Sequence, residues 1–299
     1  MAKRRKKKQP MGQKLTITGI IVVLALFIGQ QTGLINEHQV NELKQVTGVT
    51  KQYQTNRSSS QRVGSLSTNQ TSDLPRHPTQ SQAATVLTPA IKQQLNARQI
   101  SFNGTGAFVI NQNKTDLNAN VRVAPYVQLA QTDQYGRPGV ANAFLNNSSR
   151  EYRKRETTGN ATKINPVGWQ QMRLNDNRVL YNRGHSIAYA LAGGVKGFDA
   201  SEANRQNITT QTTWANQASN GDTTNTGQNY YESIVRKGLD QHKTIRYRVT
   251  PLYEGKNLVP SGSHIEAKSQ DGSIQFNVFI PNVEPGVTIN YANGSAKAQ

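Results

Sequence analysis

The sequence contains no cysteine among its 299 residues. Disulfides, thiolate metal sites and a cysteine nucleophile are therefore excluded, so any metal must be held by oxygen or imidazole. Histidine is scarce too: from residue 89 onward only His185, His242 and His264 occur, and no pair has the short spacing of an HExxH zinc site. The absence of a GxSxG elbow and of a GxxxxGK[ST] phosphate loop disfavours serine hydrolases and nucleotide-driven enzymes.

Acidic residues are few relative to basic ones, and the formal net charge is +18. Seven of the 35 Lys and Arg lie within residues 1–14. From residue 90 onward there are 23 Lys and Arg and 14 Asp and Glu, so the part expected to fold has a formal net charge of +9. Such a surface suits a polyanion: nucleic acid, or equally an acidic cell-wall polymer.

The N-terminal 34 residues have the pattern of an export signal. A basic stretch precedes an uncharged segment, residues 15–34, whose centre at 20–28 is strongly apolar. About 20 residues suffice to span a bilayer, and the positive flank stays inside. Because no small-x-small cleavage site follows, we predict an uncleaved membrane anchor with the remainder outside the cell; cleavage would make the protein secreted. A helix buried in a soluble core would not need these flanking cations.

Residues 35–88 are rich in Gln, Ser, Thr and Asn and contain few aromatics. This composition is typical of a flexible polar linker that cannot bury a core. We therefore expect three parts: an anchor at 1–34, a stalk at 35–88 and one folded domain at 89–299.

The folded part shows both strand and helix patterns. Residues 245–253 and 274–280 alternate in the manner of half-buried strands, and residues 228–241 place apolar side chains at helical spacing. Residues 141–145, together with Tyr152, are predicted to form a further helix. The expected fold class is α+β.

One short motif combines residues suited to phosphodiester hydrolysis. Asn182-Arg183-Gly184-His185 is predicted to end a strand in a polar turn from which Arg183 and His185 project together. An imidazole of near-neutral pKa can take a proton from water while a guanidinium grips the phosphate. A structural histidine with no catalytic role is the alternative on this tetrapeptide alone.

Further segments follow in a fixed order. They are Asn207 to Gln211 (NITTQ), Trp214 to Gln217 (WANQ) and Tyr230-Tyr231-Glu232. The set resembles the DNA/RNA non-specific endonuclease family, whose members carry DRGH, an NITPQ-like segment, an Asn-Gln pair and a helical Glu in that order. That family belongs to the ββα-metal, or His-Me finger, nucleases.

Within the family, the chain is most similar to membrane-bound DNA-entry nucleases of Gram-positive bacteria. The similar segments here are YALAGG (189–194), FDAS (198–201), TTWANQ (212–217), TGQNYYES (226–233) and IEAKSQDG (265–272). The resemblance covers roughly residues 90–299. It implies a central antiparallel sheet and a ββα-metal site made of the His185 hairpin and the helix carrying Asn216.

The resemblance also assigns roles to individual residues. His185 matches the general base, and Asn216 matches the ligand of Mg²⁺, for which Mn²⁺ could substitute; no small-molecule cofactor is expected. A neutral amide oxygen suits magnesium, which keeps most of its waters. Glu232 matches a Glu near the metal waters, and Asn207 matches a polar residue that supports the site. Glu232 could alternatively form only a helix ion pair with Arg236.

Several cations are candidates for contact with the nucleic-acid backbone. Arg183 is expected to steady the scissile phosphate, and Arg236 to contact nucleic acid as well. A basic run is either a track for the phosphates or merely a solvated helix face. The run consists of Arg150, Arg153, Lys154 and Arg155.

One position departs from the family pattern, because Asn182 stands where Asp is usual. An amide can preserve hydrogen bonds without supporting nearby positive charge, so activity is expected to survive but to be weakened or shifted in pH. The predicted function is an exported, sequence-non-specific, Mg²⁺-dependent endonuclease for DNA and RNA, with possible DNA-uptake partners. The alternatives are a catalytically weak surface DNA-binding module, and a hydrolase or adhesin of anionic wall polymers.

Overall fold

The computed structural model of the chain describes residues 77–159, 161–174, 176–218 and 223–299. The anchor predicted at 1–34 and most of the predicted linker lie outside these ranges. Within them, no helix combines the length and apolar character that a bilayer crossing requires. The short helices α3 (Gln80–Ala84) and α4 (Pro89–Leu95) open the described fold. Ala83, Val86 and Leu87, which precede residue 89, are buried in the main core.

A seven-stranded sheet in the order β1-β2-β9-β8-β7-β4-β3 forms the centre of the domain, and every neighbouring pair is antiparallel. Its long strands come from the C-terminal third: β7 (Ile245–Leu252), β8 (Gly262–Ser269) and β9 (Gln275–Pro281). Strands β7 and β9 were predicted from the sequence, and β8 was not. The flanking strands are β1 (Ile100–Phe102), β2 (Phe108–Ile110), β3 (Tyr126–Leu129) and β4 (Ala141–Leu145). The predicted mixed fold with a large antiparallel sheet is confirmed.

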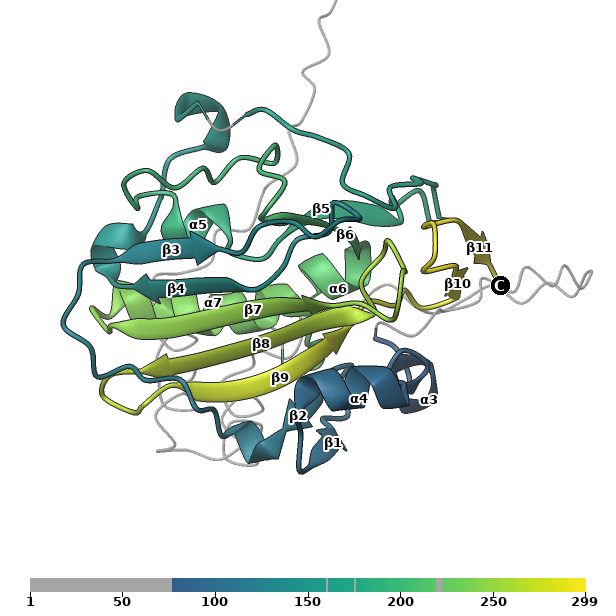
Figure 1. Cartoon of the computed structure of the whole chain (residues 1–299), viewed down its shortest axis with the longest axis horizontal. Helices are drawn as coiled ribbons and strands as arrows, with labels where there is room; N and C mark the ends of the chain where they lie inside the picture. Colours follow the sequence, from purple (N-terminus) through teal and green to yellow (C-terminus); the bar gives the residue numbers. More distant parts are fainter. Residues whose placement is uncertain (1–76, 160, 175, 219–222) are drawn as a thin grey trace, which may run out of the picture. The chain divides into compact units, whose positions relative to one another are not determined.

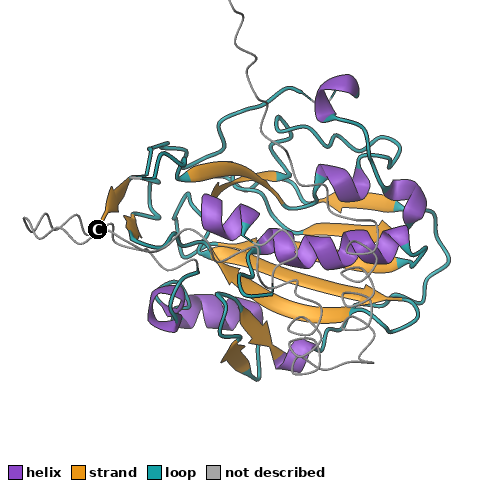
Figure 2. Ribbon diagram, turned by 180° about the vertical axis from the view of Figure 1, so that it is seen from behind, coloured by secondary structure: helices purple, strands orange, loops and turns teal. Residues whose placement is uncertain are grey.

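Helix α7 (Gln228–Asp240) packs on one face of this sheet, close to the bounds predicted from the helical spacing. Figures 1 and 2 view the sheet from opposite sides, and α7 lies behind it in the first and in front of it in the second. Val235 and Leu239 of α7 share a fully buried core with Ile245 and Tyr247 of β7. Burial of this apolar surface is the main stabilising contribution to the fold.

The helix predicted over residues 141–145 is wrong. These residues form β4, which pairs with β3 on one side and β7 on the other. A five-residue apolar run is ambiguous between helix and strand, and hydrogen bonding to two neighbours decides it. Tyr152 is not helical either: it lies in an irregular segment between the 3-10 turns Asn147–Ser149 and Arg155–Thr157.

A separate two-stranded hairpin lies beside the main sheet (Figure 1). It pairs β5 (Tyr181–His185) with β6 (Ile208–Thr212), and the connection between them contains α5 (Tyr189–Ala192). Helix α6 (Thr213–Gln217) begins at the residue after β6. A last hairpin of β10 (Val287–Ile289) and β11 (Ala296–Ala298) ends the chain.

Candidate active site

The Asn-Arg-Gly-His motif forms strand β5 itself, whereas the sequence had placed it in a turn at the end of a strand. In the hairpin, Asn182 lies opposite Gln211 and His185 opposite Ile208. Successive residues of a strand point to opposite faces, so Arg183 and His185, two residues apart, share one face. Gly184 is required because a Cβ there would overlap the side chain of Gln211. The motif is therefore a close-packed strand that presents His185 at its end.

His185 is held as a neutral imidazole. Its Nε2 lies 3.3 Å from the carbonyl oxygen of Ala200, which can only accept, so Nε2 carries the proton and Nδ1 is the nitrogen that can take another. Burial and, second, the nearby positive charge of Arg155 lower the pKa of His185 to about 4. A base that is neutral at physiological pH and oriented by a backbone carbonyl is suited to general-base chemistry.

Asn207 forms hydrogen bonds with the backbone of the residues directly after His185. Its side-chain oxygen accepts a hydrogen bond from the backbone N–H of Ile187 at 2.8 Å, and its Nδ2 donates to the carbonyl of the same residue at 3.0 Å. Its backbone carbonyl accepts from Ser186 at 2.8 Å. Asn207 is fully buried, so it can hold the backbone after His185 but has no access to substrate.

Gln228, at the first position of α7, connects several parts of the site and was missed by the sequence analysis. Its Nε2 donates to the His185 carbonyl at 2.6 Å and to Glu232 Oε1 at 2.9 Å. Its Oε1 accepts from Gln211 Nε2 at 3.0 Å. The sequence signal was available, because Gln228 precedes Glu232 by four residues and so shares its helix face.

Glu232 of α7 is buried. Burial raises the pKa of its carboxyl, opposed first by the hydrogen bond from Gln228 and then by the charge of Arg236. The predicted pair with Arg236 is present, with 3.7 Å between Arg236 Nη1 and Glu232 Oε2. Arg236 also donates to Asn229 Oδ1 at 3.0 Å, so its guanidinium is largely occupied by groups of its own helix.

Asn216 lies near the end of α6, on the helix that follows β6. Its side chain is partly buried, and no other described residue hydrogen-bonds to it. No group of three or more His, Asp or Glu residues that could hold a metal occurs in the described ranges. A metal here would therefore have an amide oxygen and water as ligands, with no cage of carboxylates or imidazoles.

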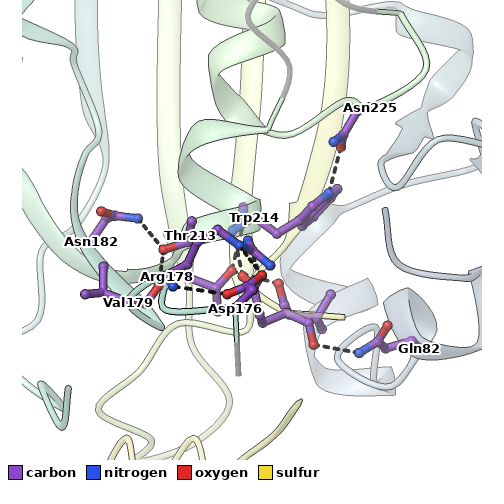
Figure 3. A network of polar contacts seen from close by, with 12 residues as sticks. Gln82, Asp176, Arg178, Val179, Asn182, Thr213, Trp214 and Asn225 are labelled. Atoms are coloured by element: carbon purple, nitrogen blue, oxygen red, sulfur yellow. Dashed lines mark hydrogen bonds and ion pairs between the residues drawn. The ribbon is translucent and has the colours of Figure 1, made fainter. Parts of the chain in front are cut away.

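Polar contacts fix helix α6 to the core, and Figure 3 shows Thr213 and Trp214 of this helix within that network, beside Arg178. Glu284 is fully buried; its Oε2 accepts from the backbone N–H of Trp214 at 2.7 Å, and its Oε1 pairs with Arg178 at 3.0 Å. Burial raises the pKa of Glu284, and these two partners oppose the rise. A carboxylate at the first turn of a helix also interacts favourably with the helix dipole. The position of Asn216 thus depends on contacts about seventy residues away in sequence.

The guanidinium of Arg183, which was expected to contact the phosphate, is largely engaged by other groups of the protein. Its Nη2 donates to Asn165 Oδ1 at 2.8 Å, its Nε donates to the carbonyl of Ile164, and its guanidinium lies 4.6 Å from the centre of the Trp169 ring. Arg155, by contrast, lies close enough for its charge to lower the His185 pKa. It pairs with Glu202, yet its buried Nε has no hydrogen-bond partner among the described residues. Arg155 is therefore better placed than Arg183 for the phosphate.

The basic run does not form a continuous track, contrary to the prediction. The side chain of Arg150 is only 7% exposed and is paired with Asp240, with 3.0 Å between Nε and Oδ1. Arg153 is 71% exposed beside Glu151, and Lys154 is exposed as well. The run is not a solvated helix face either, because Arg150, Arg153 and Lys154 lie in an irregular segment and Arg155 only begins a short 3-10 turn. Arg153 and Lys154 are the exposed cations of the run, whereas Arg155 is 25% exposed and pairs with Glu202.

The site consists of a hairpin that ends in an oriented, neutral histidine and continues into a short helix. It lies beside a large antiparallel sheet. A family model described as DNA/RNA non-specific endonuclease matches residues 117–271. The chain belongs to this family, and the predicted endonuclease activity is confirmed at that level.

Two solved structures of NucA from Streptococcus agalactiae are similar to this chain, each with 43% sequence identity. The structure with a magnesium ion bound covers 72% of this chain and 100% of its own, with a TM-score of 0.66. The structure with no metal bound covers 73% and 100%, with a TM-score of 0.65. The family resemblance drawn from the ordered motifs is thereby confirmed.

Proposed function

We propose that this protein is a Mg²⁺-dependent endonuclease that cleaves DNA and RNA without sequence specificity, at a ββα-metal site formed by β5, β6 and α6. The observation that carries the proposal is His185, held neutral at the end of β5 with Nε2 bound to a carbonyl, in a hairpin that continues into the helix of Asn216. The magnesium-bound relative supports the choice of metal.

The residues present fit a hydrated magnesium ion. Asn216 offers a hard, neutral oxygen that no other described residue engages, and Glu232 offers a carboxylate near the hairpin. Zinc usually takes three or four His, Cys or carboxylate ligands, which the described residues do not bring together. Magnesium, or manganese in its place, accepts one protein ligand and several waters. When bound, the metal would stabilise negative charge on the leaving oxygen.

In the proposed mechanism, His185 Nδ1 takes a proton from the attacking water as the water oxygen bonds to phosphorus. The bond from phosphorus to the leaving oxygen breaks in line with this attack. Arg155, together with any part of Arg183 left exposed, neutralises the phosphate. Gln228 holds the carbonyl of His185 and Asn207 holds the backbone of Ile187, so the base needs little reorganisation during the reaction.

Low sequence specificity follows from the kind of groups available. The candidate contacts are cations and amides suited to phosphate and sugar, which position a strand but carry no direct base information. The basic surface of the domain supports binding to both DNA and RNA. We expect sequence preference to be weak for either polymer.

Digestion of plasmid DNA and of RNA by the full chain tests the proposal. Both polymers should be degraded with magnesium, and chelator should stop cleavage reversibly, because the metal would stabilise the leaving oxygen. Manganese should restore activity to the chelated enzyme. Cleavage that persists in chelator would contradict the metal-dependent mechanism, and cleavage of DNA alone would contradict the dual substrate range.

We also propose that the domain acts outside the cell, anchored to the membrane through residues 1–34. The basic stretch, the apolar centre and the polar segment that follows support this placement. A function in DNA uptake, with uptake machinery as a partner, is consistent with a surface-anchored nuclease. Protease added to intact cells should remove the nuclease domain from the membrane fraction; protection of the domain would rule out this location.

The Asn182→Asp variant tests the departure from the family motif. Asn182 Nδ2 donates at 2.8 Å to Thr213 Oγ1, which itself donates to the carbonyl of Val179 at 2.5 Å. A carboxylate would lose that hydrogen bond, so the free energy of unfolding should fall by about 1 kcal/mol. It would also place negative charge against α6, so the half-saturating magnesium concentration should fall by about threefold or more. Urea unfolding and a magnesium titration of cleavage measure the two effects.

For Asn182→Asp, an isosteric change at an exposed site, Asn293→Asp, provides the control. Because Asn293 lies in the turn between β10 and β11, this change should leave the magnesium titration unaltered. A magnesium requirement that rises in Asn182→Asp would show that the amide, and not a carboxylate, suits this site.

A further inference from the structure

Tyr152 is an exposed aromatic side chain that the proposed mechanism does not use. Among the described residues, it and Val123 are the two large hydrophobic side chains left exposed, and Tyr152 is 68% accessible to solvent. Exposed single apolar residues are common and need no explanation by themselves. What distinguishes Tyr152 is the way in which its ring is held.

Two partners fix the Tyr152 ring in place. The Arg150 guanidinium carbon lies 4.6 Å from the ring centre, and the phenol oxygen donates to Asp240 Oδ1 at 2.6 Å. Arg150 is itself immobilised, because it pairs with Asp240 and donates to the carbonyl of Ala190. One face of the ring is therefore covered by a buried cation, and the exposed area belongs to the rest of the ring. A rigid aromatic face is available to a ligand at low cost in side-chain entropy.

The ring belongs to the segment that borders the active site. Tyr189, four residues after His185, donates through its hydroxyl to the Arg153 carbonyl at 3.0 Å. Arg155, three residues beyond Tyr152, pairs with Glu202, which lies two residues after Ala200, whose carbonyl is 3.3 Å from His185 Nε2. Three extended residues span only about 10 Å. A nucleic-acid strand bound across His185 can therefore reach the Tyr152 ring.

The charges beside the ring suit a polyanion. Arg153 and Lys154 directly follow Tyr152, and both side chains are exposed. Arg153 pairs with Glu151 at 2.7 Å, whereas Lys154 forms no ion pair with a described residue. Proteins that bind single-stranded nucleic acid combine cations along the backbone with aromatic rings on which bases stack. An acidic peptide would also satisfy the cations, but it would leave the aromatic face without a flat partner.

Together these observations lead to one inference, which rests on the proposed function. We infer that Tyr152 is a stacking platform for an unpaired nucleobase of the substrate, adjacent to the scissile phosphate. Bases within a duplex are stacked on one another and cannot reach such a platform without being unpaired. Tyr152 thus favours single-stranded or locally opened substrate over intact duplex.

The test compares wild type with Tyr152→Ala and Tyr152→Phe on one single-stranded oligonucleotide and on the same sequence as a duplex, all with magnesium. Base–aromatic stacking predicts that Tyr152→Ala lowers kcat/KM on the single strand by about 5- to 100-fold, mainly through KM. The value for the duplex should change far less. Tyr152→Phe keeps the ring and should stay close to wild type, whereas Val123→Ala, at the other exposed apolar site, should alter neither substrate.

An abasic nucleotide placed at successive positions locates the stacked base. At one position, it should lower wild-type cleavage to the level of Tyr152→Ala and leave the variant unaffected. Equal losses on single strand and duplex, a Tyr152→Phe variant as impaired as Tyr152→Ala, or the absence of any such position would each overturn the inference. Urea unfolding of the variants shows whether loss of the Arg150 contact has affected the fold.

Binding in chelator separates this inference from the proposed function. If wild type fails to cleave with magnesium, the proposed function fails, while anisotropy of a labelled single strand still tests the platform. Weaker binding by Tyr152→Ala, but not by Tyr152→Phe, would support stacking. Equal binding by all three proteins would refute it.

Discussion

The His185→Ala variant is expected to lose about 10²- to 10⁴-fold in kcat for both DNA and RNA, the usual contribution of a general base. The imidazole is neutral and oriented, with Nε2 bound to the Ala200 carbonyl, and alanine leaves no group that can take the proton from water. Nucleic-acid binding in chelator should change little, because the backbone groups and cations around the site remain. Single-turnover cleavage and anisotropy measure the two quantities.

A matched control for this variant is His242→Asn. His242 lies in a left-handed turn after α7, with φ of 61°, and asparagine tolerates that conformation. This variant removes another imidazole and should cleave at the wild-type rate. Cleavage retained by His185→Ala would exclude His185 as the base, and equal loss in both variants would indicate a general effect on folding.

The pH profile provides a second test of the same residue. Because the pKa of His185 is lowered to about 4, the acidic limb of kcat should lie well below the ordinary imidazole range. Arg155 contributes to that shift, so Arg155→Gln should move the limb to higher pH, in addition to any loss of phosphate contact. An acidic limb that does not move would mean that Arg155 has little influence on the base.

The Asn216→Ala variant is expected to show the second large effect: at least a hundredfold loss of cleavage at limiting magnesium, partly restored by excess metal. Even loss of a group that only orients a ligand typically costs about 10- to 100-fold in metal affinity or activity, and loss of a ligand should cost more. The Asn216→Asp variant supplies an oxygen at the same position and should retain metal-dependent cleavage. Magnesium titrations of cleavage, with binding of Mn²⁺ as a direct readout, measure both variants.

The control for Asn216 is Gln217→Ala, the next residue of α6, whose side chain is exposed. This change should leave the metal titration nearly unaltered, since Gln217 makes only one long contact, 3.4 Å to Asn182 Oδ1. A normal magnesium requirement in Asn216→Ala would remove Asn216 from the metal site. Equal defects in Asn216→Ala and Gln217→Ala would instead implicate the stability of the helix.

Much of the site was predictable because its chemistry is carried by short motifs in a fixed order. His185, Asn207, Asn216 and Glu232 were identified from the sequence, and the structure places each on the hairpin, on the helix that follows it or on α7. Their roles in catalysis and metal binding stay predictions. The strands at residues 245–253 and 274–280 were predictable for a similar reason, since local alternation reports burial on one face.

The errors arose where a residue's partner lies far away in the sequence. Arg150 looked like part of a cationic track, but it pairs with Asp240, ninety residues later. Arg183 was expected to contact the scissile phosphate, which stays a prediction, and its guanidinium is bound by the segment containing Asn165. No local pattern indicates such pairs, because the sequence does not distinguish an arginine exposed to solvent from an arginine in an ion pair.

The amino-acid sequence by itself determined the family, the types of residue available for catalysis and the basic character of the domain, because these depend on composition and on motifs a few residues long. Only the tertiary structure decided which arginine approaches His185, that residues 141–145 form a strand, that Gln228 connects the backbone carbonyl of His185 to Glu232, and that Tyr152 is held exposed. The physical reason is that hydrogen bonds, ion pairs and burial act between atoms that are close in space, whatever their separation along the chain.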